Sequence, residues 1–242
     1  MSVKLLKRSS VLKNTIFFIM LSFVYYHIVH SLFAQVSTID MPFLVQNALN
    51  SKLLIALGLL TMLQVWRAKK ISILFLGVFF GWVFLDSFLL FLHGFDKVIL
   101  ILSFIYVIFS FYYSIFWKLE LEDASYHPCF NLSDINIRPT YPVQVELTLP
   151  EGEVYSGWIS NLDDESCFVL LDEKWDELRG RLNLKIFFEG YEFESFARVV
   201  STYGAGLGLK LNSRPKKQSS SSLGWGDFYD IMSDRGYVQN II

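Results

Sequence analysis

Three side chains suited to proton or ion chemistry lie inside apolar stretches of the first half of the chain. Asp86 is a carboxylate within one stretch, and His27 and His30 share a face of a predicted helix in another. A charge buried in a bilayer costs roughly a few kcal/mol, so such a carboxylate is by default a functional hypothesis. The three side chains could form a proton- or ion-handling cluster. We favour a simpler interpretation, in which Asp86 reaches the membrane surface or pairs with Lys97 and the histidines pack inward as neutral groups.

The second half of the chain offers few groups for catalysis or metal binding. His127 is its only histidine, and it lies two residues from Cys129 without two further ligands at a recognisable spacing. Cys129 and Cys167 are the only cysteines, and each is typical of a small buried hydrophobe or a free thiol. We therefore predict no catalytic residue, no metal site, no cofactor and no enzyme activity.

Four apolar runs fill the first half of the chain and stop near Trp117. A helix needs roughly 20 apolar residues to cross a bilayer core, and each run comes close to that length. The predicted transmembrane helices are 15–35, 43–66, 71–92 and 98–117. The second is the weakest, because polar residues precede its short apolar core: Gln46, Asn47, Asn50 and Lys52.

Cationic residues next to these runs predict the orientation of the chain, since they prefer the cytoplasmic side of a membrane. One set of flanks carries Lys4, Lys7, Arg8, Lys13, Arg67, Lys69, Lys70 and Lys118, whereas the alternate loops carry only Lys52 and Lys97. We therefore expect a multi-pass protein, with the N-terminal residues 1–14 and the whole of 118–242 in the cytoplasm.

The period of the sequence changes to two after a polar connector at 118–136. Apolar and polar residues then alternate in short runs, separated by turns rich in glycine and charge. The predicted strands are 143–149, 154–161, 167–171, 182–188, 191–201 and 207–211. Six short strands predict a small antiparallel barrel over 137–213 behind the four-helix transmembrane region. The net charge of −2, without a basic stripe, predicts no nucleic-acid partner.

Three local features add to this pattern: Arg138-Pro139 before the first strand, a polar motif at Asn161–Ser166 after the second, and the closing hairpin at Tyr203–Leu211. In these features and in the order of its predicted elements along the chain, 137–213 resembles the PilZ domain. This six-stranded barrel is widely used by bacteria to read the second messenger cyclic di-GMP. The resemblance implies a protein of the bacterial inner membrane that takes part in cyclic di-GMP signalling.

The resemblance also implies where the ligand would bind. The family uses an R-x-x-x-R pair and a D/N-x-S-x-x-G motif; here Arg138 and Asn161 match, Asp163 replaces the serine and Ser166 replaces the glycine. These four are the predicted ligand-binding residues. The second arginine is missing, and Arg179, Arg181 and Arg198 are candidates to replace it. The acidic run 163–165 would repel a dianionic ligand.

The last segment, 214–242, combines a Ser-rich linker with a short amphipathic helix. Trp225, Phe228 and Met232 recur at helical spacing. This helix folds back onto the barrel, or it docks onto a protein partner or the membrane surface. The sequence as a whole predicts a membrane-anchored regulatory protein whose barrel is a receptor or a signal-coupling module. The alternative is a barrel that binds no nucleotide and, with the helix 225–232, serves as a protein–protein adaptor at the inner membrane.

Overall fold

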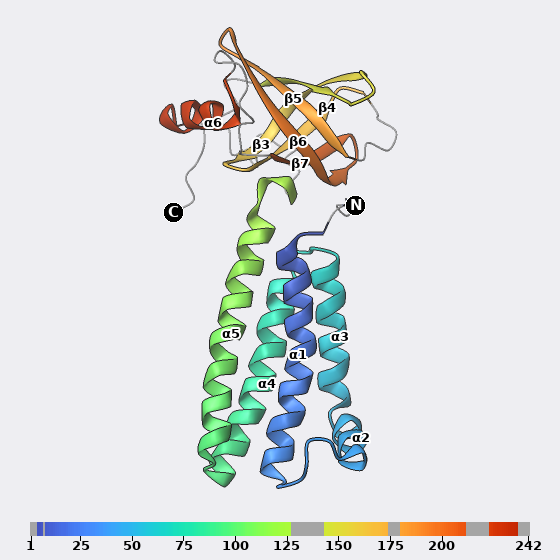
Figure 1. Cartoon of the computed structure of the whole chain (residues 1–242), viewed down its shortest axis with the longest axis vertical. Coiled ribbons are helices and arrows are strands. Elements are labelled where there is room, and N and C mark those ends of the chain that lie inside the picture. The colour runs from blue at the N-terminus through green and yellow to red at the C-terminus, as the bar shows by residue number, and fades with distance from the viewer. Residues whose placement is uncertain (1–3, 7, 127–142, 174–179, 212–222, 237–242) are drawn as a thin grey trace. The chain divides into compact units, whose positions relative to one another are not determined.

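The computed structural model describes residues 4–6, 8–126, 143–173, 180–211 and 223–236 (Figure 1). The described residues form two compact units. The helical unit is Ser9–Leu121, and the barrel unit starts at Glu122 and also includes the residues before Ser9. Each unit has its own interior and is described by itself.

The helical unit contains five helices: α1 (Ser10–Phe33), α2 (Met41–Asn50), α3 (Lys52–Trp66), α4 (Ser72–Gly94) and α5 (Lys97–Glu122). Three of them, α1, α4 and α5, are long and apolar enough to cross a membrane. They cover three of the four predicted transmembrane helices. By length and composition, the chain therefore has the helices of a membrane protein.

The predicted helix 43–66 is not one continuous helix. It is divided between α2 and α3, whose axes bend by 76° at Ser51. The polar residues Asn47, Asn50, Ser51 and Lys52 surround the break and interrupt the apolar run. At a rise of about 1.5 Å per residue, α3 alone is shorter than the roughly 30 Å hydrocarbon core of a bilayer. The pair reaches spanning length only when α2 is counted with it.

Small hydroxyl residues lie inside the helical unit, whereas many of its large apolar side chains face outward. The hydroxyls of Ser22 and Ser87 donate to carbonyl oxygens four residues earlier, at 2.9 and 2.8 Å. Between helices, the Tyr106 hydroxyl donates to Ser22 Oγ at 3.2 Å, and Trp117 Nε1 donates to Ser72 Oγ at 2.7 Å. Small residues at helix contacts are typical of helices that associate in lipid.

The barrel is formed by six antiparallel strands: β2 (Gln144–Thr148), β3 (Val154–Asp163), β4 (Ser166–Leu171), β5 (Arg181–Phe188), β6 (Tyr191–Tyr203) and β7 (Gly206–Leu211). The order is β6-β5-β2-β3-β4-β7, and β7 also pairs with β6, which closes the sheet. The predicted six-stranded antiparallel barrel is confirmed. Register shifts after Ile159 and Val199 bend the two longest strands, as barrel closure requires.

The N-terminal segment is part of the barrel unit, which the sequence did not predict. Strand β1 (Lys4–Leu5) pairs with β6, with Lys4 opposite Thr202 and Leu5 opposite Ser201. The Leu6 amide continues this pairing by donating to the Val200 carbonyl at 2.9 Å. Two paired residues give no recognisable alternation, so the sequence predicts a cytoplasmic location for 1–14 but no strand there.

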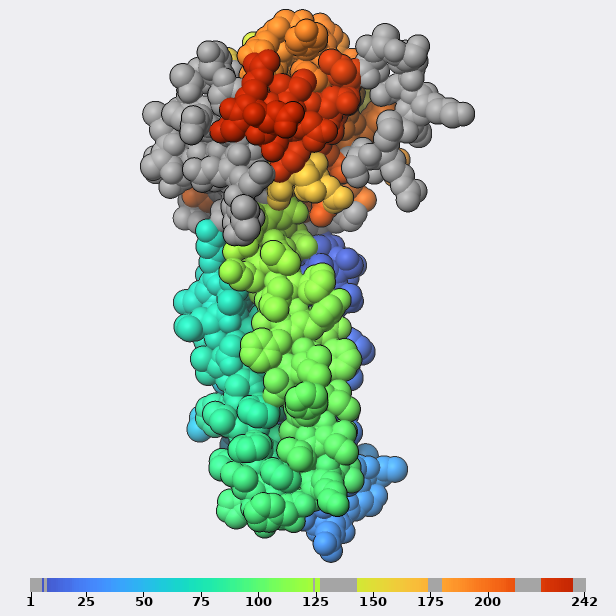
Figure 2. Space-filling view, turned by 90° about the vertical axis from the view of Figure 1, so that its left-hand side faces the viewer, coloured from blue at the N-terminus to red at the C-terminus, as the bar shows by residue number. Residues whose placement is uncertain are grey.

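Helix α6 (Trp225–Asp234) packs against the barrel, as Figure 2 shows for the red segment. Trp225, Phe228 and Met232 are buried and belong to the same apolar core as the strands. The Trp225 indole Nε1 also donates to the Asp164 carbonyl at 2.7 Å. Of the two predicted possibilities, the structure has the helix folded back, so its apolar face is not available to a partner.

Candidate functional site

The predicted ligand motif lies at the turn that joins β3 to β4. Leu162 and Cys167 pair with each other and point into the core, so Asn161, Asp163 and Ser166 lie on the outer side of the sheet. Asn161 and Ser166 are nevertheless buried, and Asp163 is half-buried. Another segment of the chain therefore covers the outer side of β3 and β4 here.

The covering segment begins at Glu122, the last residue of α5. It consists of Glu122, Asp123 and a short 3-10 helix, η1 (Ala124–Tyr126), and we call Glu122–Tyr126 the docking segment. Asp123 Oδ1 accepts hydrogen bonds from the Ser166 hydroxyl and, at 2.9 Å, from the Ser125 amide. Its Oδ2 lies 3.5 Å from Lys210 Nζ. A carboxylate of the chain itself thus occupies the position beside Ser166.

A close backbone approach holds the rest of the docking segment against β6 and β7. The Ser201 hydroxyl donates to the Ser125 carbonyl oxygen. Gly208 lies directly beneath, and a Cβ at this position would collide with the same carbonyl and with Ser201 Oγ. The absence of a side chain at Gly208 therefore makes the docking possible. The sequence placed Gly208 in the last strand but gave no sign of what would cover it.

The β3–β4 turn is acidic, and the environment of one carboxylate opposes its ionisation. Burial raises the pKa of Asp163, and the charges of Asp164 and Asp123 raise it further, against a lowering by the Asp164 amide. That amide donates to Asp163 Oδ1 at 2.9 Å. The turn therefore already carries repelling negative charges before any anionic ligand arrives.

Two of the predicted basic residues, Arg138 and Arg179, lie outside the described residues. The other two candidates lie on neighbouring strands, with Arg181 of β5 opposite Arg198 of β6. Arg198 is in turn opposite Lys210 of β7, and Lys210 is opposite Ser166 of β4. Directly opposed residues share one side of a sheet. The register therefore brings Arg181 and Arg198 into one line with Ser166, whereas the spacing of these residues in the sequence gave no such indication.

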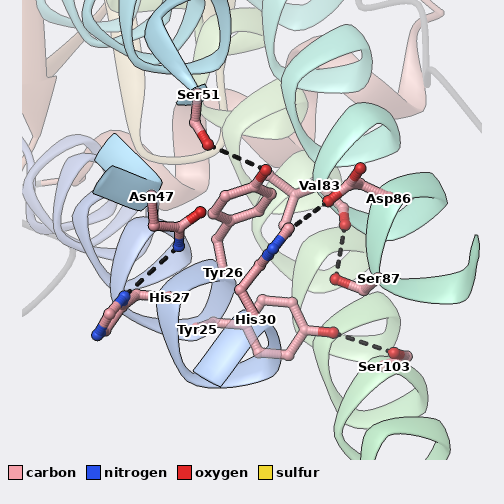
Figure 3. Close-up of polar contacts among 10 residues, drawn as sticks. All are labelled: Tyr25, Tyr26, His27, His30, Asn47, Ser51, Val83, Asp86, Ser87 and Ser103. Atoms are coloured by element: carbon pink, nitrogen blue, oxygen red, sulfur yellow. Dashed lines mark hydrogen bonds and ion pairs between the residues drawn. The ribbon is translucent and has the colours of Figure 1, made fainter. Parts of the chain in front are cut away.

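In the helical unit, one of the predicted contacts around Asp86 is present. His30 Nε2 lies 2.7 Å from Asp86 Oδ2 and joins α1 to α4 (Figure 3). Beside this pair, the Ser51 hydroxyl donates to the Tyr26 hydroxyl at 3.1 Å. Asp86 is thus placed with His30, and in the part of the chain that the structure describes it makes no ion pair with Lys97.

His27 has different neighbours, although it lies one turn from His30. Its Nε2 is 3.0 Å from the Thr38 carbonyl oxygen. Figure 3 shows its other contact, in which Asn47 Nδ2 lies 3.5 Å from its Nδ1. These contacts connect α1 to the segment that follows it and to α2, and they leave His27 out of the contact with Asp86. A mainly apolar cavity of about 750 Å³ opens between α1, α2 and α3, with Tyr26, His27, Asn47 and Ser51 in its lining. Across the described residues, no three His, Cys, Asp or Glu side chains gather as metal ligands.

Comparison with models of known protein families gives no match, and comparison with curated proteins gives none either. Among solved structures, the chain is similar to a PilZ domain of CeSA from a cellulose-synthesizing bacterium. The two sequences are 17% identical and the structures align with a TM-score of 0.29, over 40% of this chain and 92% of that chain. The fold of the barrel rests on its own strand order and closure.

Proposed function

We propose that this chain is a membrane-anchored regulatory protein whose barrel couples a cytoplasmic signal to the helical unit. The observation that carries the proposal lies at Ser201 of β6. The backbone of Ser201 pairs with Leu5, shortly before α1, and its hydroxyl donates to the Ser125 carbonyl, shortly after α5. The segments that lead into and out of the helical unit thus meet at one residue of the barrel.

This arrangement suits signal coupling for a physical reason. Closely packed contacts have discrete arrangements rather than a continuous range, so a ligand that shifts β6 or β7 changes both segments together. The chain offers no long linker on either side, since Leu6 and Ser10 are separated by three residues and α5 ends directly before Asp123. We place both ends of the helical unit, and the barrel, on the cytoplasmic side of the bacterial inner membrane.

The signal that we propose is cyclic di-GMP, on the strength of the PilZ resemblance in the sequence. Arg138, Asn161, Asp163 and Ser166 would contact it. Calorimetric titration of the full-length protein in detergent tests this assignment. We expect micromolar or tighter binding, weakened at least about tenfold by Arg138→Ala because a guanidinium binds phosphate through charge-assisted hydrogen bonds. Arg67→Ala, in the turn between α3 and α4, is the matched control and should bind normally. Absence of heat from folded protein would contradict the receptor assignment.

The coupling itself is tested by Gly208→Ala. The added methyl group collides with the Ser125 carbonyl, so we expect the docking segment to detach and the barrel to lose about 1–3 kcal/mol of stability. Hydrogen exchange of peptides covering 122–126 reports the detachment. Gly226→Ala in α6 is the control, because a Cβ there has no neighbour within 4 Å. Unchanged exchange in Gly208→Ala would mean that the docking segment is held elsewhere.

A second function, that of an adaptor without a nucleotide, is favoured by one observation. The Asp123 carboxylate already accepts the hydrogen bond of the Ser166 hydroxyl, next to the acidic turn. Under this alternative, the titration gives no heat while Gly208→Ala still disrupts the coupling. The outer surface of the barrel, rather than the buried face of α6, would then contact the protein partner.

A further inference from the structure

The outer face of the barrel carries a line of three cations on adjacent strands. Arg181, Arg198 and Lys210 occupy directly opposed positions on β5, β6 and β7, and all three are exposed. Strands are about 4.8 Å apart, so the line spans on the order of 10 Å. Like charges in opposed positions destabilise a sheet. Such a line is consistent with a site for an anion that neutralises it.

The two arginines have no counter-ion in the part of the chain that the structure describes, where the ion pairs involve other cations. Lys185, on the same strand as Arg181, shows the contrast, because it lies 3.3 Å from Glu192 and 3.4 Å from Glu194. Among the described residues, β5 thus has one cation, Lys185, with two carboxylate partners and another, Arg181, with no ion pair.

Lys210, at the end of the line, does have an anion, and this anion belongs to the docking segment. The Asp123 carboxylate contacts the Lys210 ammonium and the Ser166 hydroxyl together. A cation beside a hydroxyl donor is a set of groups that also suits a phosphate oxygen. Asp123 thus occupies the place that a phosphate would take at this end of the line.

We propose that Arg181, Arg198, Lys210 and Ser166 form a phosphate-binding subsite whose resting occupant is Asp123. The inference rests on the proposed nucleotide function and supplies the cations that the incomplete arginine motif lacks. A phosphate diester that reaches Lys210 and Ser166 displaces the Asp123 carboxylate. Arg198 and Arg181 then provide planar, permanently charged donors for the remaining phosphate oxygens.

Displacement of Asp123 loosens the docking segment, because the same carboxylate accepts a hydrogen bond from the Ser125 amide. The docked state is also incompletely satisfied, since the buried Ser125 hydroxyl has no hydrogen-bond partner among the described residues. A buried hydroxyl without a partner has a desolvation cost, which favours release once Asp123 is displaced. Asp123 follows the last residue of α5, so the ligand acts directly on the chain that leaves the helical unit.

The test uses the full-length protein in neutral phosphatidylcholine nanodiscs with cyclic di-GMP as the probe. We expect Asp123→Asn to bind about tenfold more tightly, because it keeps the acceptor oxygen but removes the competing charge. Arg198→Ala and Lys210→Ala should each weaken binding about tenfold or more, while the control Lys185→Ala leaves it unchanged. Binding should also speed hydrogen exchange of the Ser125 amide in the wild-type protein.

The outcomes separate this subsite from the proposed function. Binding that is lost in Arg138→Ala but is unaffected by Asp123→Asn, Arg198→Ala and Lys210→Ala overturns the subsite and leaves the receptor function standing. Binding that slows exchange at Ser125 overturns the displacement of Asp123.

A lipid headgroup is the other source of the same phosphate chemistry. In nanodiscs that contain phosphatidylglycerol, hydrogen exchange of the Ser125 amide that is faster without nucleotide, and is no longer faster in Arg198→Ala, supports the subsite. If cyclic di-GMP gives no response in the same protein, the subsite stands and the nucleotide function fails. No response to cyclic di-GMP or to phosphatidylglycerol, in wild type and Asp123→Asn alike, overturns the subsite.

Discussion

Two buried serine hydroxyls of the helical unit donate within their own helix, whereas two buried serine hydroxyls of the barrel unit donate across long stretches of chain. Ser22 and Ser87 each donate to the carbonyl four residues earlier. Ser166 donates to Asp123, and Ser201 donates to the Ser125 carbonyl, over sequence separations of 43 and 76 residues. A local bond helps a helix bury its hydroxyl. A distant bond fixes where two segments meet, so the polar contacts of the barrel carry information about its assembly.

The largest expected effect tests whether α6 belongs to this long-range assembly. Phe228 is fully buried against Phe188 and Phe193, so Phe228→Ala should cost about 3–5 kcal/mol. Thermal or urea unfolding of the full-length protein measures the loss. Asp230→Ala, on the exposed side of α6, is the control. A loss below about 1 kcal/mol for Phe228→Ala would mean that α6 is a detachable helix and would restore it as a docking surface.

An intermediate effect is expected in the helical unit. The His30–Asp86 contact joins α1 to α4, and polar contacts between membrane helices contribute on average about 0.6 kcal/mol. A double-mutant cycle of His30→Ala and Asp86→Asn, followed by unfolding in detergent, should give a coupling of about 0.5–1.5 kcal/mol. Asp96→Asn, which keeps an oxygen for the Val98 amide, is the control. If the losses of unfolding free energy in the two single variants simply add in the double variant, the two residues act independently. The contact would then not stabilise the packing of α1 against α4.

The smallest expected effect concerns the acidic turn of the barrel. Because burial raises the pKa of Asp163, the folded barrel binds this proton more readily than the unfolded chain. The resulting stability is present below the ordinary Asp pKa of about 3.9 and is lost as the pH rises through the raised value. Asp163→Asn should therefore stabilise the barrel at neutral pH, by less than about 1 kcal/mol, and have no benefit in stronger acid.

Urea unfolding of Asp163→Asn at several pH values measures this difference, with Glu165→Gln at an exposed position of the same turn as the control. A benefit of Asp163→Asn that does not depend on pH would contradict burial as its cause. The acidic turn would then have no pH-dependent effect on the stability of the barrel.

Local patterns in the sequence were sufficient for most of the elements. The alternation in 143–149 and in 182–188 predicted strands that are present as β2 and β5, because a strand with one buried face has a period of two. The apolar run at 71–92 likewise predicted α4. The break at Ser51 was not predicted as a bend, because the polar residues before it were assigned to the end of a straight helix.

The candidate site was less accessible to this reasoning because register brings it together. Asp123 lies in a connector that has no periodicity, and Lys210 appeared only as one residue of a strand. Their contact with Ser166 depends on the barrel closing through β4 and β7. The residue-by-residue resemblance to a ligand motif pointed to Asn161 and Ser166, but it could not show that a carboxylate of the same chain contacts Ser166.

The pairing of Lys4 and Leu5 with Thr202 and Ser201 has a consequence for the synthesis of the protein. The first strand leaves the ribosome roughly 200 residues before its partner, a wait of about 10–40 s at 5–20 residues per second. During this time the helices between them are made. The barrel unit is thus begun before the helical unit is made and closed after it, so a change at Lys4 or Leu5 would act on a late step of barrel assembly.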